Sequence, residues 1–473
     1  MANLYEQVAD EITHQINQGI YKTGDRLPGI RQLSQRFKVS VSTIVQAHQL
    51  LEDQGAVEAR PRSGFYVSGT LLNKPNIPTM STPSSKPQLV TGQALVLNLV
   101  KATNRPDILQ LGAAVPHHDF LPVKAMQRSI SRVARTKSEQ SAGYEFPPGN
   151  PGLRQQIAKR MFMAGHQCSA DDIIITNGCQ ESLTLSLQVV ARPGDIIAIE
   201  SPAFYGLLQV IDALGMKALE IPTDPEHGLS LSALQLALEQ WPIKAVAVVP
   251  NFSNPLGCCM SDARKKLLVG MLEKYQTSLI EDDVYGELSF DQSRPSSLKH
   301  YDKSDSVISC SSFSKSLLPG LRIGWVIPGK HFNQIEYQKY VTNLASPTLS
   351  QLAIADFLEH GGYDRYLRHV RDEYKKQVAR FIQSIGKYFP VGTKVTQPKG
   401  GFVIWIELPN NIDSMKLHEM ALNENISIAP GPMFSATQKY KNFIRISCAQ
   451  PWNDKLEQGL ITLGRLTHTL KQN

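Results

Sequence analysis

The sequence has no apolar run that approaches the ~20 residues needed to cross a lipid bilayer, and this absence argues against a membrane protein. Its N-terminus, MANLYE, shows no basic start followed by an apolar core, so we expect no secretory signal and a cytoplasmic location. Cysteine is scarce, because the chain has 6 and none stands at Cys-x-x-Cys or metal-ligand spacing. We therefore predict reduced thiols and no metal centre.

The remaining composition is that of a folded protein. Of the 473 residues, 42% are hydrophobic and 19% are charged, which is typical of globular domains and argues against disorder. The length exceeds that of one ordinary domain, so we expect at least two. The net charge of +7 is a weak indication of a polyanionic partner.

Residues 1–69 show the pattern of short helices around a tight turn. The apolar residues that mark the inner faces of three helices are Val8, Ile12, Ile16 and Ile20, then Ile30, Leu33 and Phe37, then Ile44, Ala47 and Leu51. Pro28 suits a first helical turn. Ser40 or Ser42 can cap the third helix, and Gly55 ends it. The last two helices are typical of a helix-turn-helix, whose second helix enters the major groove of DNA.

A predicted β-hairpin follows and forms a basic wing. Residues 56–59 and 64–67 flank its turn, Arg60-Pro61-Arg62-Ser63. The alternative is a small helical domain with a hairpin and no DNA partner. Charge supports that alternative in part, since residues 1–69 hold seven Lys or Arg and seven Asp or Glu. Six of the acids lie in the first helix or after Leu51, however, so the turn, the second helix and the wing keep most of the bases.

The order LPGIRQLSQRF, VS, VSTIVQAHQLLEDQG and RPRSGFYV resembles the winged helix-turn-helix of GntR-type transcription regulators. The resemblance implies contacts with double-stranded DNA, at Arg31, Ser40, Ser42, Thr43, Arg62, Ser63 and Gly64, and the basic wing adds Arg60. Gln46 is a candidate base reader, because a glutamine amide can pair with adenine. Val41 and Val45 stand where many relatives have an arginine, so the preferred base sequence stays open.

Residues 70–92 separate this domain from the rest of the chain. They hold four prolines, several serines and threonines, and no acidic residue. This composition predicts a semi-extended, flexible tether that allows the flanking domains to be repositioned.

From residue 93 to residue 473, apolar strand-like runs alternate with helical patterns, which predicts an α/β domain with a mostly parallel sheet. The runs are IIITNG, IIAIE, AVAVVP, SLIEDDVY and SVISCSS. Polar turns follow them, and ligands bind such sheets outside the carboxyl ends of the strands. Each turn alone has a plain structural explanation, and only the ordered set indicates one common ligand.

The stretch SSFSKSLLPGLRIGW, residues 311–325, contains the central residue of this set. Lys315 can form a Schiff base with a carbonyl, and Ser312, Ser314 and Arg322 are donors that suit a phosphate. A carbonyl and a phosphate on one ligand indicate pyridoxal 5'-phosphate (PLP). Asp282 can keep a pyridine nitrogen protonated, although acids at a strand end are commonly magnesium ligands.

Further turns offer partners for the same ligand. Phe204 or Tyr205 can stack on a flat cofactor, with a core aromatic as the alternative. Asn254 can donate to a phenolic oxygen, and an Asn-Pro turn without function is the alternative. Arg445 can bind a carboxylate through two parallel hydrogen bonds, and a structural salt bridge is an equal alternative.

The strings TNGCQ, SPAFYG, NPLG, DDVY, SFSKSLLPGLRIG and FIRIS resemble, in this order, the fold-type I PLP aminotransferases. The resemblance implies a PLP-dependent transferase fold with a smaller C-terminal subdomain, and a homodimer. Catalytic roles then fall on Lys315, Asp282 and Tyr285. The cofactor-binding set adds Asn254 at the ring oxygen, Phe204 or Tyr205 on the ring face, and Gly178, Cys179, Gln180, Ser312, Ser314 and Arg322 at the phosphate, with Tyr144 reaching the phosphate of the other subunit. Arg445 matches the binder of the substrate carboxylate.

The two domains and their tether together resemble the MocR subfamily of bacterial transcription regulators. The resemblance implies a regulator that binds PLP on Lys315 and senses an amino compound or PLP itself. Two alternatives stay open: a catalytically active PLP-dependent aminotransferase with an accessory DNA-binding domain, and a PLP protein whose N-terminal domain binds only protein partners. The same site residues serve sensing and turnover, so the sequence does not separate the first two.

Overall fold

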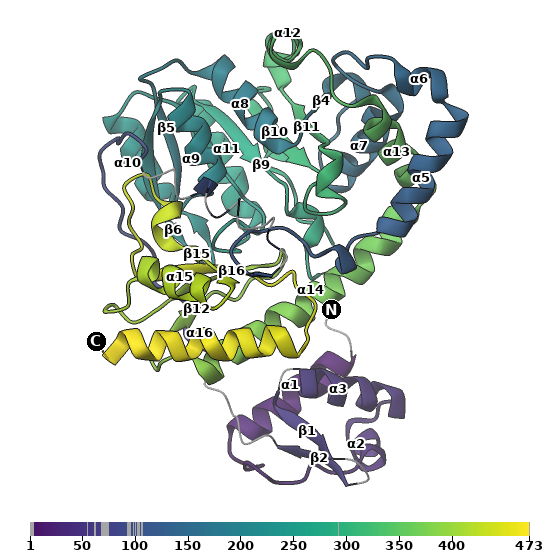
Figure 1. Cartoon of the computed structure of the whole chain (residues 1–473), viewed down its shortest axis with the longest axis vertical. Helices are drawn as coiled ribbons and strands as arrows, with labels where there is room; N and C mark the ends of the chain where they lie inside the picture. Colours follow the sequence, from purple (N-terminus) through teal and green to yellow (C-terminus); the bar gives the residue numbers. More distant parts are fainter. Residues whose placement is uncertain are drawn as a thin grey trace.

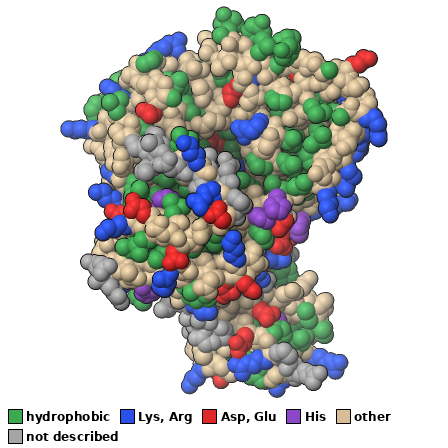
Figure 2. All heavy atoms as spheres, viewed as in Figure 1, with side chains coloured by type: hydrophobic (Ala, Val, Ile, Leu, Met, Phe, Trp, Pro, Cys, Tyr) green, Lys and Arg blue, Asp and Glu red, His purple; other side chains and the backbone are tan. Residues whose placement is uncertain are grey.

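The computed structural model describes residues 4–53, 55–60, 63–67, 75–91, 96–97, 99, 101, 105, 107–291 and 293–472. Residues 4–67 form a small lobe, which we call the head, and residues 107–472 form the much larger body (Figures 1 and 2). The head lies below the body in this view, next to its two long helices, α14 (Gly362–Tyr388) and α16 (Asp454–Gln472).

The described part of the head has the predicted order of elements. They are α1 (Leu4–Asn17), α2 (Ile30–Phe37), α3 (Val41–Asp53), β1 (Val57–Arg60) and β2 (Gly64–Val67). One predicted inner-face position, Ile20, is wrong, because α1 ends before it and the Ile20 side chain is 60% exposed. Gly19, at a positive φ of 74°, turns the chain away from the helix there.

Local hydrogen bonds and one ring stack hold α3 and the wing in place. The Ser40 hydroxyl accepts from the Thr43 backbone N–H at 3.1 Å, which is the predicted N-cap of α3. Gly55, with φ 66°, follows the end of the helix. The buried His48 ring of α3 stacks on Phe65 of β2 with centroids 4.2 Å apart, so the wing packs directly on this helix.

The body is built around an eight-stranded sheet of order β4-β11-β10-β9-β8-β5-β6-β7. Its strands are β4 (Ile174–Thr176), β5 (Ile196–Ser201), β6 (Lys217–Asp224), β7 (Gly228–Leu229), β8 (Ile243–Val248), β9 (Ser278–Asp282), β10 (Val307–Ser312) and β11 (Gly324–Ile327). β10, β9, β8, β5 and β6 run parallel, while β11 is antiparallel to β10 and β4, and β7 is antiparallel to β6. The predicted mostly parallel sheet is confirmed.

All five predicted runs are strands of this sheet, namely β4, β5, β8, β9 and β10. Helices cover the sheet, and Figure 1 shows them on both of its faces. They are α5 (Val123–Thr136), α6 (Ser138–Ala142), α7 (Pro151–Met163), α8 (Cys179–Val190), α9 (Tyr205–Ala213), α10 (Leu231–Gln240), α11 (Asp262–Lys274), α12 (Phe332–Asn343) and α13 (Thr348–Glu359). None of the helices in the described residues is long and apolar enough to span a membrane.

A smaller subdomain completes the body, as predicted. Its four-stranded antiparallel sheet has the order β12-β13-β16-β15, with β12 (Lys394–Val395), β13 (Val403–Glu407), β15 (Ala429–Pro430) and β16 (Phe443–Ser447). A short parallel pair, β3 (Leu109–Gln110) with β14 (Ile426–Ser427), joins the start of the body to this subdomain. α14, α15 (Ser414–Asn423) and α16 pack beside it.

The connection between head and body does not hang free where the structure describes it. Residues 75–91, which we call the strap, form no helix and no strand of their own, in keeping with the predicted tether. Backbone hydrogen bonds nevertheless fasten the strap to the body, from Val395 to Asn76 at 2.8 Å, between Gln88 and Ala218 at 2.8 and 2.9 Å, and from Thr91 to Ala436 at 3.0 Å. The expectation of a flexible tether over residues 70–92 therefore does not hold for residues 75–91, while residues 70–74 and 92 lie outside the described residues. Composition shows that a segment cannot fold alone but not that a neighbouring surface will bind it.

Candidate functional site

A cavity opens in the body at the carboxyl ends of β9 and β10, beside the N-terminus of α8. Its lining contains most of the cofactor-binding residues predicted from the sequence: Lys315, Asp282, Tyr285, Asn254, Phe204, Cys179, Gln180, Ser312, Ser314 and Arg322. Leu183, Val249 and Val284 complete the wall. These three carried no signal in the sequence, since an apolar residue in a strand or helix reads as core whether or not it faces a ligand.

Lys315 extends into the cavity from the turn after β10. Its amine donates to the Ala114 carbonyl at 2.7 Å. Burial, together with the positive charge of Arg445, lowers the pKa of Lys315 to about 8, while Asp282 opposes this shift. A substantial share of this amine is therefore neutral near physiological pH, which a nucleophilic lysine requires.

Asp282 ends β9 and is only 6% exposed. Burial raises its pKa to about 6, although the Cys179 thiol favours the ionised form by donating to Oδ1 at 3.4 Å. Burial raises the pKa of the Cys179 thiol well above its usual value, so the thiol keeps its proton and remains the donor.

The predicted phosphate-binding residues gather around the turn from β4 to α8. Gly178 has a positive φ of 82°, and a side chain there would lie 2.4 Å from the Arg322 guanidinium. Arg322 itself is held by the Asn177 carbonyl at 3.0 Å and by the Ser314 hydroxyl at 3.4 Å. Glycine thus allows the guanidinium to lie against the first turn of α8, whose free N–H groups favour an anion.

Two further cavity residues, Tyr285 and Asn254, suit a ring oxygen. The Tyr285 hydroxyl is buried beside Asn254 without a well-formed hydrogen bond. Burial raises the pKa of Tyr285, so the phenol keeps its proton and can donate. A buried hydroxyl without a partner costs free energy, which makes it a candidate ligand-binding group.

Arg445 of β16 is fully buried, at 0% exposure. Its guanidinium donates to Asn254 Oδ1 at 3.2 Å and to the Gly112 carbonyl, while its Nε has no partner. The rings of Tyr205 and Phe434 lie 5.8 and 5.4 Å from it. Among the described residues no acid pairs with it, so the structural salt bridge that the sequence left open is not present there.

Four predicted residues of the body do not line the cavity, and the fully buried Arg445 is one of them. Gly178 acts through its backbone, as described above. Tyr205 packs beside Phe204, with ring centroids 4.9 Å apart, and lies toward Arg445. Tyr144 is 73% exposed, with its ring 5.6 Å from that of Phe146, so it does not reach the cavity of its own chain.

In the head, the predicted DNA-contact residues of α2 and α3 lie on the surface. Arg31, Ser42 and Gln46 are exposed, and so are Val41 at 49% and Val45 at 43%. Ser40 hydrogen-bonds Ser42 and Thr43, each at 2.8 Å, at the start of α3. Lys and Arg side chains gather at the lower edge of the head, away from the body (Figure 2).

The wing is described only in part. Arg62 lies outside the described residues, whereas Arg60 pairs with Glu58 and lies 4.3 Å over the Tyr66 ring. The Ser63 hydroxyl bonds the Tyr66 hydroxyl at 2.6 Å. Arg26, which we did not single out from the sequence, lies beside Gly64, with its Nε 3.3 Å from where a side chain would begin. No local signal pointed to Arg26, because the β-bridge between Arg26 and Tyr66 that brings it to the wing is a tertiary contact.

Comparison with known families agrees with both parts of the structure. Residues 106–463 match the family "Aminotransferase class I and II", and residues 4–67 match "Bacterial regulatory proteins, gntR family". The chain is 40% identical over 464 residues to the uncharacterized HTH-type transcriptional regulator YjiR of Escherichia coli (strain K12), covering 98% of each chain. It is 39% identical over 462 residues to the uncharacterized HTH-type transcriptional regulator YdcR of the same organism, again covering 98% of each.

The body alone is similar to solved aminotransferases. A structure of LysN, the alpha-aminoadipate aminotransferase of Thermus thermophilus, complexed with N-(5'-phosphopyridoxyl)-L-leucine, matches with a TM-score of 0.75 and 27% identity, over 81% of this chain and 96% of that one. The fold class expected from the sequence is thereby confirmed. The chain belongs to the aminotransferase class I and II family and, because a gntR-family domain precedes that body as in its full-length relatives, it is a DNA-binding transcription regulator of the MocR type.

Proposed function

We propose that the body of this regulator binds PLP at Lys315 and senses a small amino acid or related amine, and that the head transmits the state of the body to DNA. The observation that carries the proposal is Arg445, a fully buried cation with no acidic partner among the described residues. A buried charge is costly unless it is paired. A ligand carboxylate would supply the missing partner. Arg445 is close enough to the Lys315 amine for its positive charge to lower the pKa of that amine.

The residues of the cavity fit PLP in charge and in donor type. The space above Gly178, which a larger residue would fill, and the guanidinium of Arg322 suit a phosphate. The unpartnered Tyr285 hydroxyl suits the ring oxygen, and the Asp282 carboxylate suits a pyridinium nitrogen. When bound, PLP supplies a carbonyl that reacts with amines and a ring that withdraws electrons.

In this proposal the protein side chains bind and orient. Lys315 presents its partly neutral amine, because burial and Arg445 lower its pKa to about 8. Asp282 is mainly ionised at neutral pH, since its pKa is raised only to about 6, and Cys179 fixes the orientation of its carboxylate. Phe204 forms part of the wall against which a flat ring can stack. Arg445 receives the ligand carboxylate by giving up its hydrogen bonds to Asn254 and Gly112.

The strap offers a physical link from this cavity to the head. The Ser81 hydroxyl of the strap donates to the Ser201 carbonyl at 2.7 Å, three residues before the cavity residue Phe204. The Ser201 hydroxyl also bonds Tyr440 at 2.6 Å. A ligand that shifts Phe204 or Arg445 would change these contacts, and the head and the ligand must then influence each other's binding by one coupling free energy, typically ~1–3 kcal/mol.

A homodimer is part of the proposal. Exposed aromatic and apolar side chains cluster on α12 and on the loop that precedes α7: Tyr144 (73%), Phe146 (50%), Tyr337 (69%), Tyr340 (50%) and Val341 (59%). Their rings approach across the two segments, with Phe146 and Tyr340 centroids 6.3 Å apart. A second copy of the chain covering this surface would bury it and would bring Tyr144 toward the partner's cavity.

The test combines ligand and DNA measurements on the full-length protein loaded with PLP. We expect one or a few amino acids to change the affinity for operator DNA by about 5- to 150-fold, and this change to vanish in Lys315→Ala. The second candidate function is an active aminotransferase, which the near-complete set of cavity residues favours. Robust multiple-turnover transamination with a panel of amino acids and 2-oxo acids, without specific DNA binding, would overturn the regulatory proposal.

A further inference from the structure

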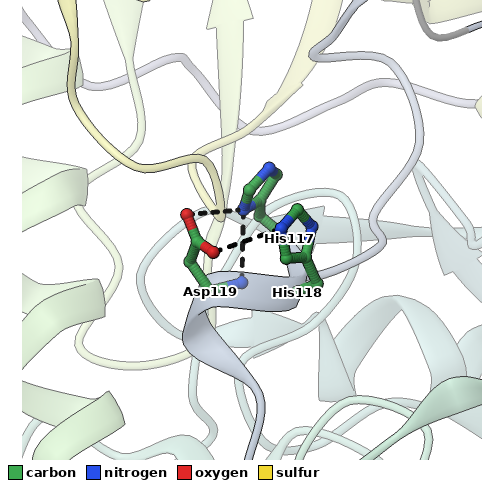
Figure 3. A group of neighbouring side chains, drawn as sticks. All are labelled: His117, His118 and Asp119. Atoms are coloured by element: carbon green, nitrogen blue, oxygen red, sulfur yellow. Dashed lines mark hydrogen bonds and ion pairs between the residues drawn. The ribbon is translucent and has the colours of Figure 1, made fainter. Parts of the chain in front are cut away.

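Three neighbouring side chains outside the cavity converge on one point of the surface. His117, His118 and Asp119 lie at the start of a short 3-10 helix, His118–Phe120, and the Asp119 carboxylate faces both imidazole rings (Figure 3). One carboxylate oxygen lies 3.4 Å from His117 Nδ1, and the other lies 3.2 Å from His118 Nε2. The two rings are themselves close, with centroids 4.0 Å apart.

These separations match the spacing of ligands around a small metal ion. Two atoms bound at about 2.0–2.2 Å to a tetrahedral Zn²⁺ ion stand about 3.3–3.5 Å apart. Both His–Asp separations are close to this value, with one oxygen of the Asp119 carboxylate facing each histidine, and three ligand atoms, one from each residue, all lie within 4.8 Å of one another. To bind one ion, the side chains would have to rotate so that one carboxylate oxygen and both imidazole nitrogens face it.

One of the two imidazoles has an identified metal-binding nitrogen. The Asp119 backbone N–H donates to His117 Nδ1 at 3.3 Å, so this nitrogen is unprotonated, and a metal ion would replace the N–H at its one lone pair. The ion pairs that the described residues make with Asp119 involve these two histidines and no lysine or arginine. An ion can arrive from solvent, because the His118 side chain is 76% exposed and the Asp119 side chain 58% exposed.

The backbone beneath the cluster is fixed. The His117 N–H donates to the Ala449 carbonyl at 3.0 Å, and the carbonyls of His117 and His118 accept from Phe120 and Leu121, each at 3.0 Å. A site whose backbone is already ordered loses less conformational freedom when it binds an ion. The same segment carries Ala114, whose carbonyl accepts from Lys315, so the cluster lies on the stretch of chain that borders the cavity.

We propose that His117 Nδ1, His118 Nε2 and one carboxylate oxygen of Asp119 bind a single late transition metal ion of the Zn²⁺ class, with the fourth position open to water. Two imidazoles favour Zn²⁺, Ni²⁺ or Cu²⁺ over Mg²⁺ and Ca²⁺, which prefer all-oxygen sites. From the sequence we expected no metal centre because the cysteines lack metal-ligand spacing, but this site contains no cysteine. The proposal does not depend on PLP, since none of the three residues lines the cavity.

The experiment is a Zn²⁺ titration of the full-length, chelator-treated protein by calorimetry, with bound zinc counted by elemental analysis after dialysis. We expect one Zn²⁺ per chain from this site, competed by Ni²⁺ and not by Mg²⁺. The double variant His117→Ala/His118→Ala should lose that bound Zn²⁺. Asp119→Asn should weaken Zn²⁺ binding by more than the about 10- to 100-fold that loss of a residue outside the ligand set typically costs. The control is His227→Ala/His468→Ala, which removes two exposed histidines elsewhere.

Circular dichroism establishes that each variant is folded, and the exposure of the cluster makes unfolding an unexpected result. A chain that binds no Zn²⁺ at micromolar concentration would overturn the proposal. So would binding that survives unchanged in His117→Ala/His118→Ala, because the ion would then be held by other groups. Equal loss in the control pair would identify non-specific surface histidine binding, and would overturn it as well.

Discussion

Replacing Arg445 by methionine separates two effects of this cation: its effect on the free energy of unfolding and its effect on the affinity for a ligand carboxylate. The guanidinium is fully buried without an acidic partner among the described residues, so its charge is desolvated and only partly compensated. Methionine has a similar length and no charge. The change relieves the charge burial but leaves Asn254 Oδ1 and the Gly112 carbonyl without a donor, at about 1–3 kcal/mol each.

These opposing effects are of similar size, since effective burial of one ion costs several kcal/mol. We therefore expect the free energy of unfolding of the PLP-free protein to change by no more than about 2 kcal/mol in either direction. Ligand binding should respond very differently. A carboxylate that loses two charge-assisted hydrogen bonds loses about 3–5 kcal/mol, which is roughly a 10²- to 10⁴-fold weaker affinity.

The assays are chemical denaturation for stability and calorimetric titration of the PLP-loaded protein with the amino acid that shifts DNA binding most. Arg154→Met is the matched control, because Arg154 is also buried (8% exposed) but pairs with Asp171 at 3.1 Å. That variant should lose stability and keep its ligand affinity. Unchanged amino acid affinity in Arg445→Met would refute the carboxylate role, and global unfolding of Arg445→Met but not of Arg445→Lys would show that the charge is structural.

Three further predictions concern the cofactor, DNA and pH. Lys315→Ala should abolish the visible absorption of the PLP-loaded protein, and a retained band would show that another lysine holds the cofactor. Arg62→Ala should weaken operator binding and lower the slope of log affinity against log salt by about 1, whereas Arg192→Ala on the body should do neither; an unchanged footprint would exclude this wing residue from DNA contact. Asp282 has a folded pKa raised from 3.8 to about 6, so the folded state holds a proton that the unfolded state has lost, and stability falls as pH rises through this window. Asp282→Asn should therefore stabilise the PLP-free protein above pH ~6 by up to about 3 kcal/mol, with the gap closing toward pH ~4; a gap independent of pH would contradict the assigned pKa.

Much of the fold followed from local pattern. The strand runs around Ile199, Val246 and Ile308 are continuous and apolar because a parallel sheet is covered on both faces, so they stand out in the sequence. The short strands β7, β12 and β14 did not, since two-residue strands are defined by their partners rather than by their own periodicity. Ile20 continued the helical spacing of α1 but lies beyond the turn at Gly19. The end of the helix is set there by the positive φ of this glycine and not by the hydrophobic pattern.

In the candidate site, too, some groups could be predicted from local sequence and others could not. Lys315, Asp282 and Arg322 could be selected from the sequence because strand ends of one sheet meet at one edge. The backbone carbonyls of Gly112 and Ala114 could not, because a carbonyl carries no side-chain signal and reaches the cavity only through tertiary packing. The anchoring of the strap could not be predicted for the same reason, because its hydrogen-bond partners Ala218, Val395 and Ala436 are remote in sequence.

The anchored strap also sets the reach of the head. Val67, the last residue of the wing, and Asn76, the first fastened residue of the strap, are nine positions apart, and a chain of that length extends to at most about 30 Å. If the strap detached from the body as far as Thr91, the free connection from Val67 would be twenty-four positions long and would extend to about 80 Å. In the proposed homodimer, detached straps would let the two heads bind widely spaced operator half-sites, whereas fastened straps would allow only a narrow range of spacings. Measuring DNA affinity for operators whose half-sites are separated by spacers of increasing length would therefore show whether the strap is fastened or detached in each state of the body.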